Sequence, residues 1–276
     1  LGIAWASGAV YYDAPLPAES GVDRTFLAGG YALVVFLTLL ALGSRLRRFL
    51  GWITAIALVA VPWSLKKPVR QADWEPAWSR MPSASTTGDL VTFHNFRNFD
   101  YDLQGGVTER WETRVADLSK LKGLDLAHHV LKHDLLAHPL LCFDFGDQGH
   151  IAFSVEIRYR KGQEFSPLRG LYKQYNLMYL VGDERDFLRE RATIRNEPVR
   201  LYRSTYSLER IREMFRETVA AMNALQENPR FYNSLTANCS TSYIKQAPPG
   251  KRPRFDYRII LNGLIESLLY EREVIA

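Results

Sequence analysis

The stretch SLTANCSTSY, from Ser234 to Tyr243, places a cysteine where a loop turns into a helix. An asparagine before a helix accepts hydrogen bonds from free backbone N–H groups, so Asn238 is expected to cap a short helix that begins at Cys239. A thiol at this position lies at the positive end of the helix dipole, which favours the thiolate. Backbone amides that could hold an oxyanion lie at the same place. The spacing predicts a cysteine nucleophile, which needs a base.

A histidine on a predicted hairpin could supply that base. Two strand-like runs, LAHPLLCFDF (136–145) and IAFSVEIR (151–158), flank the turn sequence GDQG. If the apolar rows of both strands share one face, the pleat sets His138 across from Glu156 or Arg158. A histidine beside a carboxylate is a possible catalytic pair, so we expect His138 to act as the base and Glu156 to orient it.

The other histidines and the second cysteine carry weaker signals. His128, His129 and His133 are expected in a helix or loop, where His129 and His133, four residues apart, would be two potential metal ligands. No third ligand follows at suitable spacing, so we predict neither a metal nor a cofactor. Cys142 and Cys239 could instead form a disulfide in an oxidising compartment, and this alternative stays open.

Two apolar runs predict an anchor in a membrane. Residues 25–44 and 49–65 contain no charge and are about long enough to cross a hydrocarbon core. Residues 1–12 resemble the second half of a further span. Arginines fill the turn between the two complete spans and the preceding loop is acidic, so the positive-inside rule keeps that turn in the cytoplasm. Everything after residue 65 is then expected in the periplasm of a Gram-negative cell.

The remaining sequence predicts a linker and one extracytoplasmic domain. Residues 66–89 are rich in Pro, Ser and Thr and are expected to form the linker, and residues 90–276 the domain. The domain is expected to contain an amphipathic helix at 207–226 and a C-terminal helix at 257–271. Outside residues 1–64 the chain carries 31 basic and 27 acidic residues. This small excess is spread along the domain without interleaved aromatics, so we expect no nucleic-acid partner, and either contact with anionic lipid headgroups or a solvated surface.

Several motifs in this order resemble the Lnb-type lipoprotein N-acyltransferase family over about residues 90–245. They are AHPLLCFDF, SVEIR, SPLRGLYKQY, VGDERDFLR and FYNSLTANCSTSY. The resemblance implies an α+β, permuted papain-like domain with an antiparallel sheet, here preceded by transmembrane helices. It carries the family's cysteine, histidine and acid onto Cys239, His138 and Glu156. The chain departs from the family pattern at Pro139 and Cys142, and the proline indicates an edge strand or a local distortion.

The resemblance also implies a reaction. We expect an enzyme of the bacterial inner membrane that moves an acyl chain from a phospholipid, through a thioester on Cys239, to the N-terminal diacylglyceryl-cysteine of a lipoprotein. Asn238, Arg158, Arg169 and Lys173 are candidates for substrate binding, although the three bases could equally form a solvated face. Two alternatives remain: a papain-like cysteine amidase or peptidase of the cell wall, and a non-enzymatic envelope module with a Cys142–Cys239 disulfide.

Overall fold

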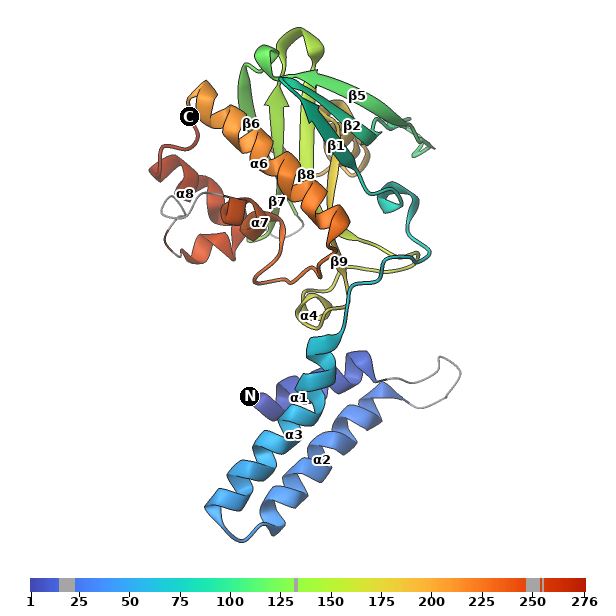
Figure 1. Cartoon of the computed structure of the whole chain (residues 1–276), viewed down its shortest axis with the longest axis vertical. Helices are drawn as coiled ribbons and strands as arrows, with labels where there is room; N and C mark the ends of the chain where they lie inside the picture. Colours follow the sequence, from blue (N-terminus) through green and yellow to red (C-terminus); the bar gives the residue numbers. More distant parts are fainter. Residues whose placement is uncertain (15–22, 132–133, 247–253, 255) are drawn as a thin grey trace. The chain divides into compact units, whose positions relative to one another are not determined.

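The computed structural model of the chain describes residues 1–14, 23–131, 134–246, 254 and 256–276. These residues form two compact units (Figure 1). Unit 1 consists of Leu1–Pro68 together with Phe165–Gln174, and unit 2 consists of Val69–Glu164 together with Tyr175–Ala276. A segment from the middle of the sequence therefore belongs to the same unit as the apolar N-terminal helices.

Unit 1 is helical. Its helices are α1 (Gly2–Asp13), α2 (Arg24–Ala41), α3 (Arg45–Leu65) and the short α4 (Pro167–Leu171). Side-chain caps start two of them, because Asp23 accepts the N–H of Thr25 at 2.7 Å and Ser44 accepts the N–H of Arg47 at 3.2 Å. The capping residues fix the starts of α2 and α3 close to the predicted beginnings of the apolar runs.

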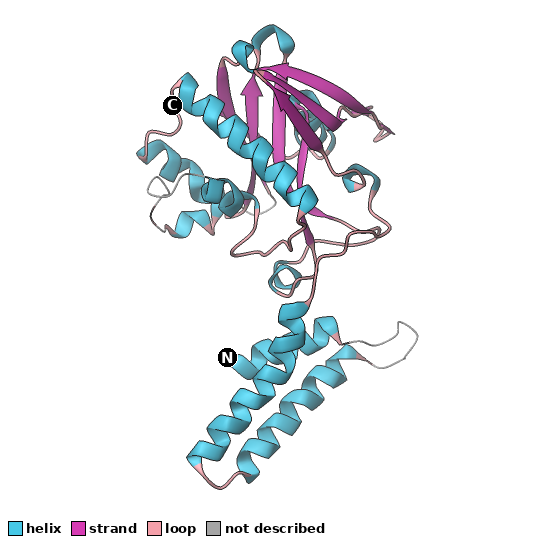
Figure 2. Ribbon diagram, viewed as in Figure 1, coloured by secondary structure: helices cyan, strands magenta, loops and turns pink. Residues whose placement is uncertain are grey.

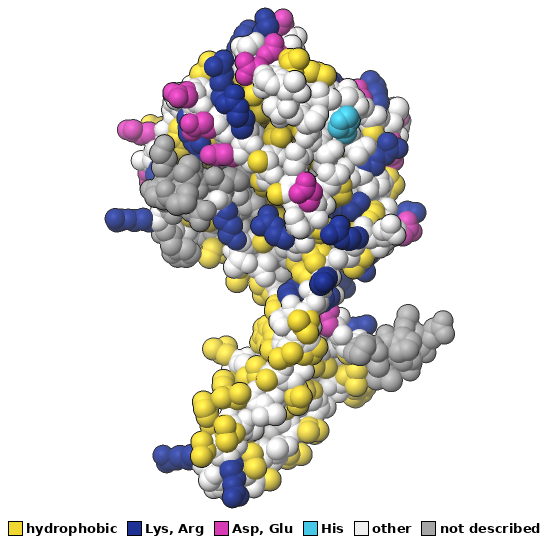
Figure 3. Space-filling view, in the orientation of Figure 1, with side chains coloured by type: hydrophobic (Ala, Val, Ile, Leu, Met, Phe, Trp, Pro, Cys, Tyr) yellow, Lys and Arg dark blue, Asp and Glu magenta, His cyan; other side chains and the backbone are white. Residues whose placement is uncertain are grey.

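Two of these helices have the length and composition of membrane spans. The helix α2 has 18 residues and α3 has 21, and their mean hydropathies are 1.7 and 1.5. Val35 is the only buried residue of these two helices, and Figure 3 shows hydrophobic side chains on the outside of this unit. Exposed apolar helices of this length fit a hydrocarbon environment. The α1 helix covers the predicted partial span, and residues 15–22 of the predicted acidic loop lie outside the described residues.

Unit 2 is built on a mixed β-sheet. Among the described residues eight strands join it, in the order β1-β2-β9-β8-β7-β6-β10, with β5 paired to β2. Their bounds are β1 (Ser83–Thr87), β2 (Leu90–Arg97), β5 (Trp111–Asp117), β6 (Gly123–Val130), β7 (Ala137–Asp144), β8 (His150–Arg158), β9 (Asn176–Asp183) and β10 (Val199–Arg203). The pairs are antiparallel except β2 with β9, which is parallel. The sheet is thus mixed rather than wholly antiparallel as expected, and the fold class is α+β.

Helices cover both faces of the sheet (Figure 2). The long helix α6 (Leu208–Glu227) packs on one face through Ile211, Phe215, Val219, Met222 and Leu225, as its apolar spacing predicts, whereas Leu208 stays exposed. On the opposite face α5 (Glu184–Arg189) covers a smaller cluster. Successive residues of a strand alternate between these two faces, so the side of each site residue follows from the register.

The predicted hairpin is confirmed, and its surroundings differ from expectation. The strands β7 and β8 pair antiparallel from Leu140–Ser154 to Asp144–His150, around a 3-10 turn at Gly146–Gln148. Because β6 flanks β7 on its other side, β7 is not an edge strand. The structure agrees with the other interpretation of Pro139, a local distortion of the strand. The β7–β8 ladder ends at Leu140, immediately after Pro139, which has no N–H to donate.

Three other elements differ from the sequence predictions. The strand β1 lies in the range predicted as linker, where its Ser and Thr residues pair with β2 across a turn at Gly88. His128 and His129 lie on β6, not in a helix or loop, because that segment pairs with both β7 and β10. His133 lies outside the described residues.

The segment predicted as one C-terminal helix is broken into three pieces. These are 3-10 turns at Tyr257–Ile259 and Asn262–Leu264, followed by α8 (Ile265–Glu271). The break comes at Gly263, whose N–H donates to the carbonyl of Leu135 at 3.0 Å. A Cβ at this position would lie 1.9 Å from the carbonyl oxygen of Asp134, so only glycine permits this approach. The break brings Asn262 against the start of β7.

Candidate active site

Cys239 is the first residue of helix α7 (Cys239–Gln246), as the sequence predicts. Asn238 caps this helix: its Oδ1 accepts the N–H of Thr241 at 2.9 Å, and Thr241 Oγ1 accepts the N–H of Asn238 at 2.9 Å. Cys239 is 8% exposed and packs against the core on the α6 side of the sheet. Its thiol therefore lies at the positive end of a capped helix with restricted access to water.

His138 and Glu156 meet where the β7–β8 ladder ends. They lie one repeat of the pleat beyond the last pair of the ladder, Leu140–Ser154, and His138 Nε2 lies 3.2 Å from Glu156 Oε1. Ser154 lies between them, since its hydroxyl is 2.6 Å from the same Nε2 and donates to Glu156 Oε1 at 2.6 Å. Nε2 is thus occupied by oxygen atoms, which leaves Nδ1 as the nitrogen for a nucleophile.

Electrostatics hold this pair in its charged form. Burial disfavours charge on His138, but the Glu156 carboxylate and a hydrogen bond with Cys239 outweigh burial and raise the pKa of His138 to about 9. Burial would also raise the pKa of Glu156, and the charge and hydrogen bond of His138, the Arg191 charge and the Ser154 hydroxyl together hold it well below its usual value. The arrangement is an imidazolium between a carboxylate and a thiol.

Arg191, which follows helix α5 in the sequence, forms an ion pair with the Glu156 carboxylate. It lies in a π-turn (Glu190–Ile194) that continues α5, it is 4% exposed, and its guanidinium donates to Glu156 Oε1 at 3.0 Å and to the carbonyl of Phe187 at 3.0 Å. Glu190 also joins the buried Arg97 at 3.0 Å. Such π-turns often occur at functional sites because they re-aim one side chain. Here the turn aims Arg191 at Glu156.

The Asn262 side chain links the helix that begins at Cys239 to the strand that carries His138. Its amide donates to the carbonyl of Ala137 at 2.6 Å and to Ser240 Oγ at 2.9 Å, and it lies 3.7 Å from Cys239 Sγ. Its Oδ1 accepts the N–H of Ala137 at 2.9 Å. Ala137 precedes His138 and Ser240 follows Cys239, so one side chain fixes the spacing between the elements that carry His138 and Cys239.

The remaining predicted binding residues are engaged elsewhere. The Arg158 guanidinium donates to the carbonyl of Trp78 at 3.0 Å and lies 4.2 Å above the ring of Trp74, so it holds the start of unit 2. Arg169 and Lys173 belong to unit 1, where Arg169 is exposed on α4 and Lys173 donates to the carbonyl of Trp63 at 2.9 Å. Arg158 is thus engaged within unit 2 by Trp74 and Trp78, and Arg169 and Lys173 belong to the other unit.

His129 and Cys142 are neighbours of the site with other partners. His129 faces His138 across the β6–β7 pair, but burial and the Arg191 charge lower its pKa to about 4 and its Nε2 contacts Glu197 at 2.7 Å. Cys142 is fully buried in the cluster on the α5 side of the sheet. Both cysteines are free thiols. Within the described ranges no three His, Cys, Asp or Glu side chains gather as metal ligands.

A comparison with known protein families identifies the family of this chain. The pattern of the Lnb N-terminal periplasmic domain matches residues 107–263, which is more than half of the chain. The chain belongs to the Lnb family. No curated protein and no solved structure matches it. The Lnb match encloses both partners of the hairpin, the capped cysteine and Asn262, and with the apolar helices of unit 1 it fits a membrane-anchored protein whose domain faces the periplasm.

Sequence reasoning missed three residues of the site. Ser154 had a local signal, because it precedes Glu156 by two and shares its face of the strand. Arg191 stands in the charged run DERDFLRER, whose pattern does not tell a solvated face from a buried ion pair. Asn262 had no signal in the Lnb resemblance or in the local pattern, since its role depends on a break in a segment that looks helical.

Proposed function

We propose that this Lnb-family chain is a membrane-bound lipoprotein N-acyltransferase with Cys239 as nucleophile, His138 as base and Glu156 as the orienting acid. One arrangement carries the proposal: Cys239 begins a helix capped by Asn238, Asn262 joins that helix to the strand of His138, and His138 Nε2 lies 3.2 Å from the largely buried Glu156 carboxylate. A weak nucleophile in a difficult acyl transfer is activated in this way by an adjacent, oriented base.

The first half-reaction acylates the enzyme. The Cys239 thiolate attacks the carbonyl carbon of a phospholipid ester, and the carbonyl oxygen becomes an oxyanion. The backbone N–H groups of Cys239 and Ser240 lie in the first turn of the helix, where they have no carbonyl acceptor within the helix. They can therefore donate hydrogen bonds to this oxyanion. The C–O bond then breaks, the His138 imidazolium gives its proton to the leaving alcohol of the lysophospholipid, and a thioester remains on Cys239.

The second half-reaction transfers the chain. The α-amine of a diacylglyceryl-cysteine attacks the thioester carbonyl, an N–C bond forms and the C–S bond breaks. The amine loses its proton to neutral His138, and Cys239 leaves as thiolate beside the regenerated imidazolium. The same histidine therefore serves as acid in one half-reaction and as base in the other, with Glu156 stabilising the charged form.

Fold and anchor support this assignment. Histidine and acid precede the cysteine in sequence, and the cysteine helix packs against the strands that carry them, which is the order of a permuted papain-like domain. We assign residues 1–65 to the anchor, residues 66–82 to the linker and the rest to the catalytic domain. The anchor would lie in the inner membrane with the domain in the periplasm, where both lipid substrates are within reach.

Intact mass spectrometry tests the proposal. Protein in phospholipid nanodiscs is expected to carry an acyl group on Cys239 that hydroxylamine removes, and added diacylated lipopeptide should gain an N-acyl chain. Cys239→Ser should lose both products, whereas Cys142→Ser should keep them because Cys142 is fully buried among apolar side chains, in a different cluster from Cys239. Cleavage of peptidoglycan stems without any acyl adduct would favour the amidase alternative, and equal loss from both variants would favour the disulfide module.

A further inference from the structure

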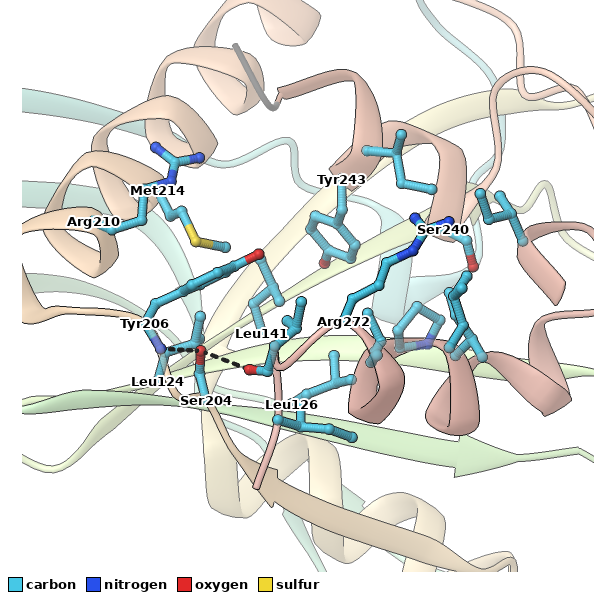
Figure 4. A pocket seen from close by; sticks show the side chains of 18 of the residues that line it. Leu124, Leu126, Leu141, Ser204, Tyr206, Arg210, Met214, Ser240, Tyr243 and Arg272 are labelled. Carbon is cyan, nitrogen blue, oxygen red and sulfur yellow. Dashed lines mark hydrogen bonds between the residues drawn. The ribbon is translucent and has the colours of Figure 1, made fainter. Parts of the chain in front are cut away.

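A cavity of about 540 Å³ lies beside the cysteine helix in unit 2 (Figure 4). The strands β6 and β7 form one wall, α6 and α7 form others, and the C-terminal segment covers it. The volume falls within the range of pockets that hold small molecules. Its aliphatic lining comprises Leu124, Leu126, Pro139, Leu141, Met214, Ile244, Ile259, Ile265, Leu268, Leu269, Val274 and Ile275.

Several polar groups of this lining already have hydrogen-bond or ion-pair partners within the protein. Arg210 and Glu217 form an ion pair at 3.1 Å, and Ser204 Oγ donates to the carbonyl of Val274 at 3.3 Å. The guanidinium of Arg272 donates to the carbonyl of Arg254 at 3.4 Å. A polar ligand would have to compete with these contacts, so the cavity suits an apolar occupant.

The position of the cavity relates it to the reacting groups. Ser240, which directly follows Cys239 at the start of α7, lines it, and so does Pro139, which neighbours His138 on β7 but lies on the opposite face of that strand. Figure 4 shows Ser240 on one side of the cavity and Tyr206 with Arg210 on the other, with Met214 beside Arg210. A chain attached to Cys239 can enter beside Ser240 and run between the sheet and α6 toward Met214.

We propose that this cavity holds the hydrocarbon chain of the acyl group while that group is bound to Cys239, with the methyl end of the chain near Met214. The inference rests on the proposed function, and it adds that the size of this cavity limits the length of the acyl chain that can be transferred. Burying each methylene group from water favours binding, and closing off the far end should lower the rate about four-fold for each methylene group that it excludes.

Two variants on the same helix test whether the cavity limits the length of the acyl chain. Met214→Trp narrows the far end of the cavity, whereas Ala220→Trp introduces the same side chain on α6 in a different cavity of about 370 Å³. With dioctanoyl and dipalmitoyl phosphatidylethanolamine supplied separately, Met214→Trp should keep the octanoyl adduct and lose the palmitoyl adduct at least ten-fold, and Ala220→Trp should keep both. An unchanged ratio in Met214→Trp, as expected if the cavity takes a peptide side chain, overturns the proposal.

A second measurement does not depend on catalysis or on the folding of a variant. A long-chain alkyl methanethiosulfonate with a terminal diazirine couples to the Cys239 thiol of the wild-type protein as a mixed disulfide, and methanesulfinate leaves. After illumination we expect crosslinks to Met214, Tyr206 or Leu268. Crosslinks to Ala220 or Arg230, or to solvent alone, overturn the cavity assignment. If the crosslinks to the cavity form but no enzymatic acyl adduct on Cys239 is found, the proposed function is refuted.

Discussion

The side chain of Asn262 and the backbone of Ala137 form a two-way hydrogen bond, with distances of 2.6 and 2.9 Å. Ala137 starts the strand that carries His138, and the same amide reaches Ser240, beside Cys239. The cysteine and the histidine come from elements about a hundred residues apart in the sequence. Their separation is therefore set by a third element, the broken C-terminal segment.

Replacing Asn262 should change the thiol as well as the stability. Asn262→Leu leaves the backbone groups of Ala137 without this partner and should cost about 1–3 kcal/mol of unfolding free energy. Asn262→Asp keeps the acceptor but sets a carboxylate near the sulfur, so alkylation of Cys239 by iodoacetamide should move to higher pH. Asn223 makes the same two-way contact with Ala84, so Asn223→Leu is the matched control. If both leucine variants lose stability and the alkylation profile of Asn262→Asp stays at its wild-type position, Asn262 has only a structural role.

The stability of unit 2 should depend on the charge of His138. Because the pKa of His138 is raised from 6.5 to about 9, protonation favours the folded state by about 3 kcal/mol below pH 6.5. This contribution should decline as the pH rises from 6.5 to 9 and be absent above that range. Glu156→Gln removes the main cause of the raised pKa, so its unfolding free energy should vary much less over this window. Chemical denaturation at several pH values measures both curves, and parallel curves would contradict the assignment.

The proposed roles of His138 and Glu156 predict unequal losses of rate. His138→Ala removes the proton acceptor and donor, so formation of the acyl adduct should fall by about 10²–10⁴-fold. Glu156→Gln preserves the shape and the contact with Ser154 but not the charge, so it should cost less than loss of the histidine. Single-turnover mass spectrometry of the adduct gives both rates. A greater loss in Glu156→Gln than in His138→Ala would reverse the roles.

The hairpin and the cysteine helix were predictable because their signals are local. The alternation of apolar residues fixes the faces of β7 and β8. Asn238 marks the start of α7 through a contact with Thr241, only three residues further along the chain. The site also needs Arg191 and Asn262, whose contacts join segments far apart in the sequence. Pairing across long separations also turned His128 and His129 into strand residues, although their local pattern suited a helix. The partner strands, not the segment itself, decided that outcome.

The orientation of the anchor is open to a direct test. Arg45, Arg47 and Arg48 lie at the turn between α2 and α3 and should keep that turn in the cytoplasm. Protease added to intact spheroplasts should therefore digest the domain that follows Leu65. A cytoplasmic marker protein should survive the same treatment. Digestion only after lysis would place the domain on the cytoplasmic side.

Arg191 should set the lowest pH at which the proposed activity persists. Its guanidinium helps to hold the pKa of Glu156 below the usual value, so the Glu156 contribution is present at neutral pH and is lost only as the pH falls well below the ordinary range of a carboxyl group. Arg191→Met raises that pKa, so activity and stability should both fail at a higher pH than in the wild type. Arg185 lies on the preceding helix and contacts Asn98 instead, so Arg185→Met is the control and should leave the acid limb in place. A pH–rate profile whose acid limb moves equally in both variants, or in neither, would show that Arg191 does not act through Glu156.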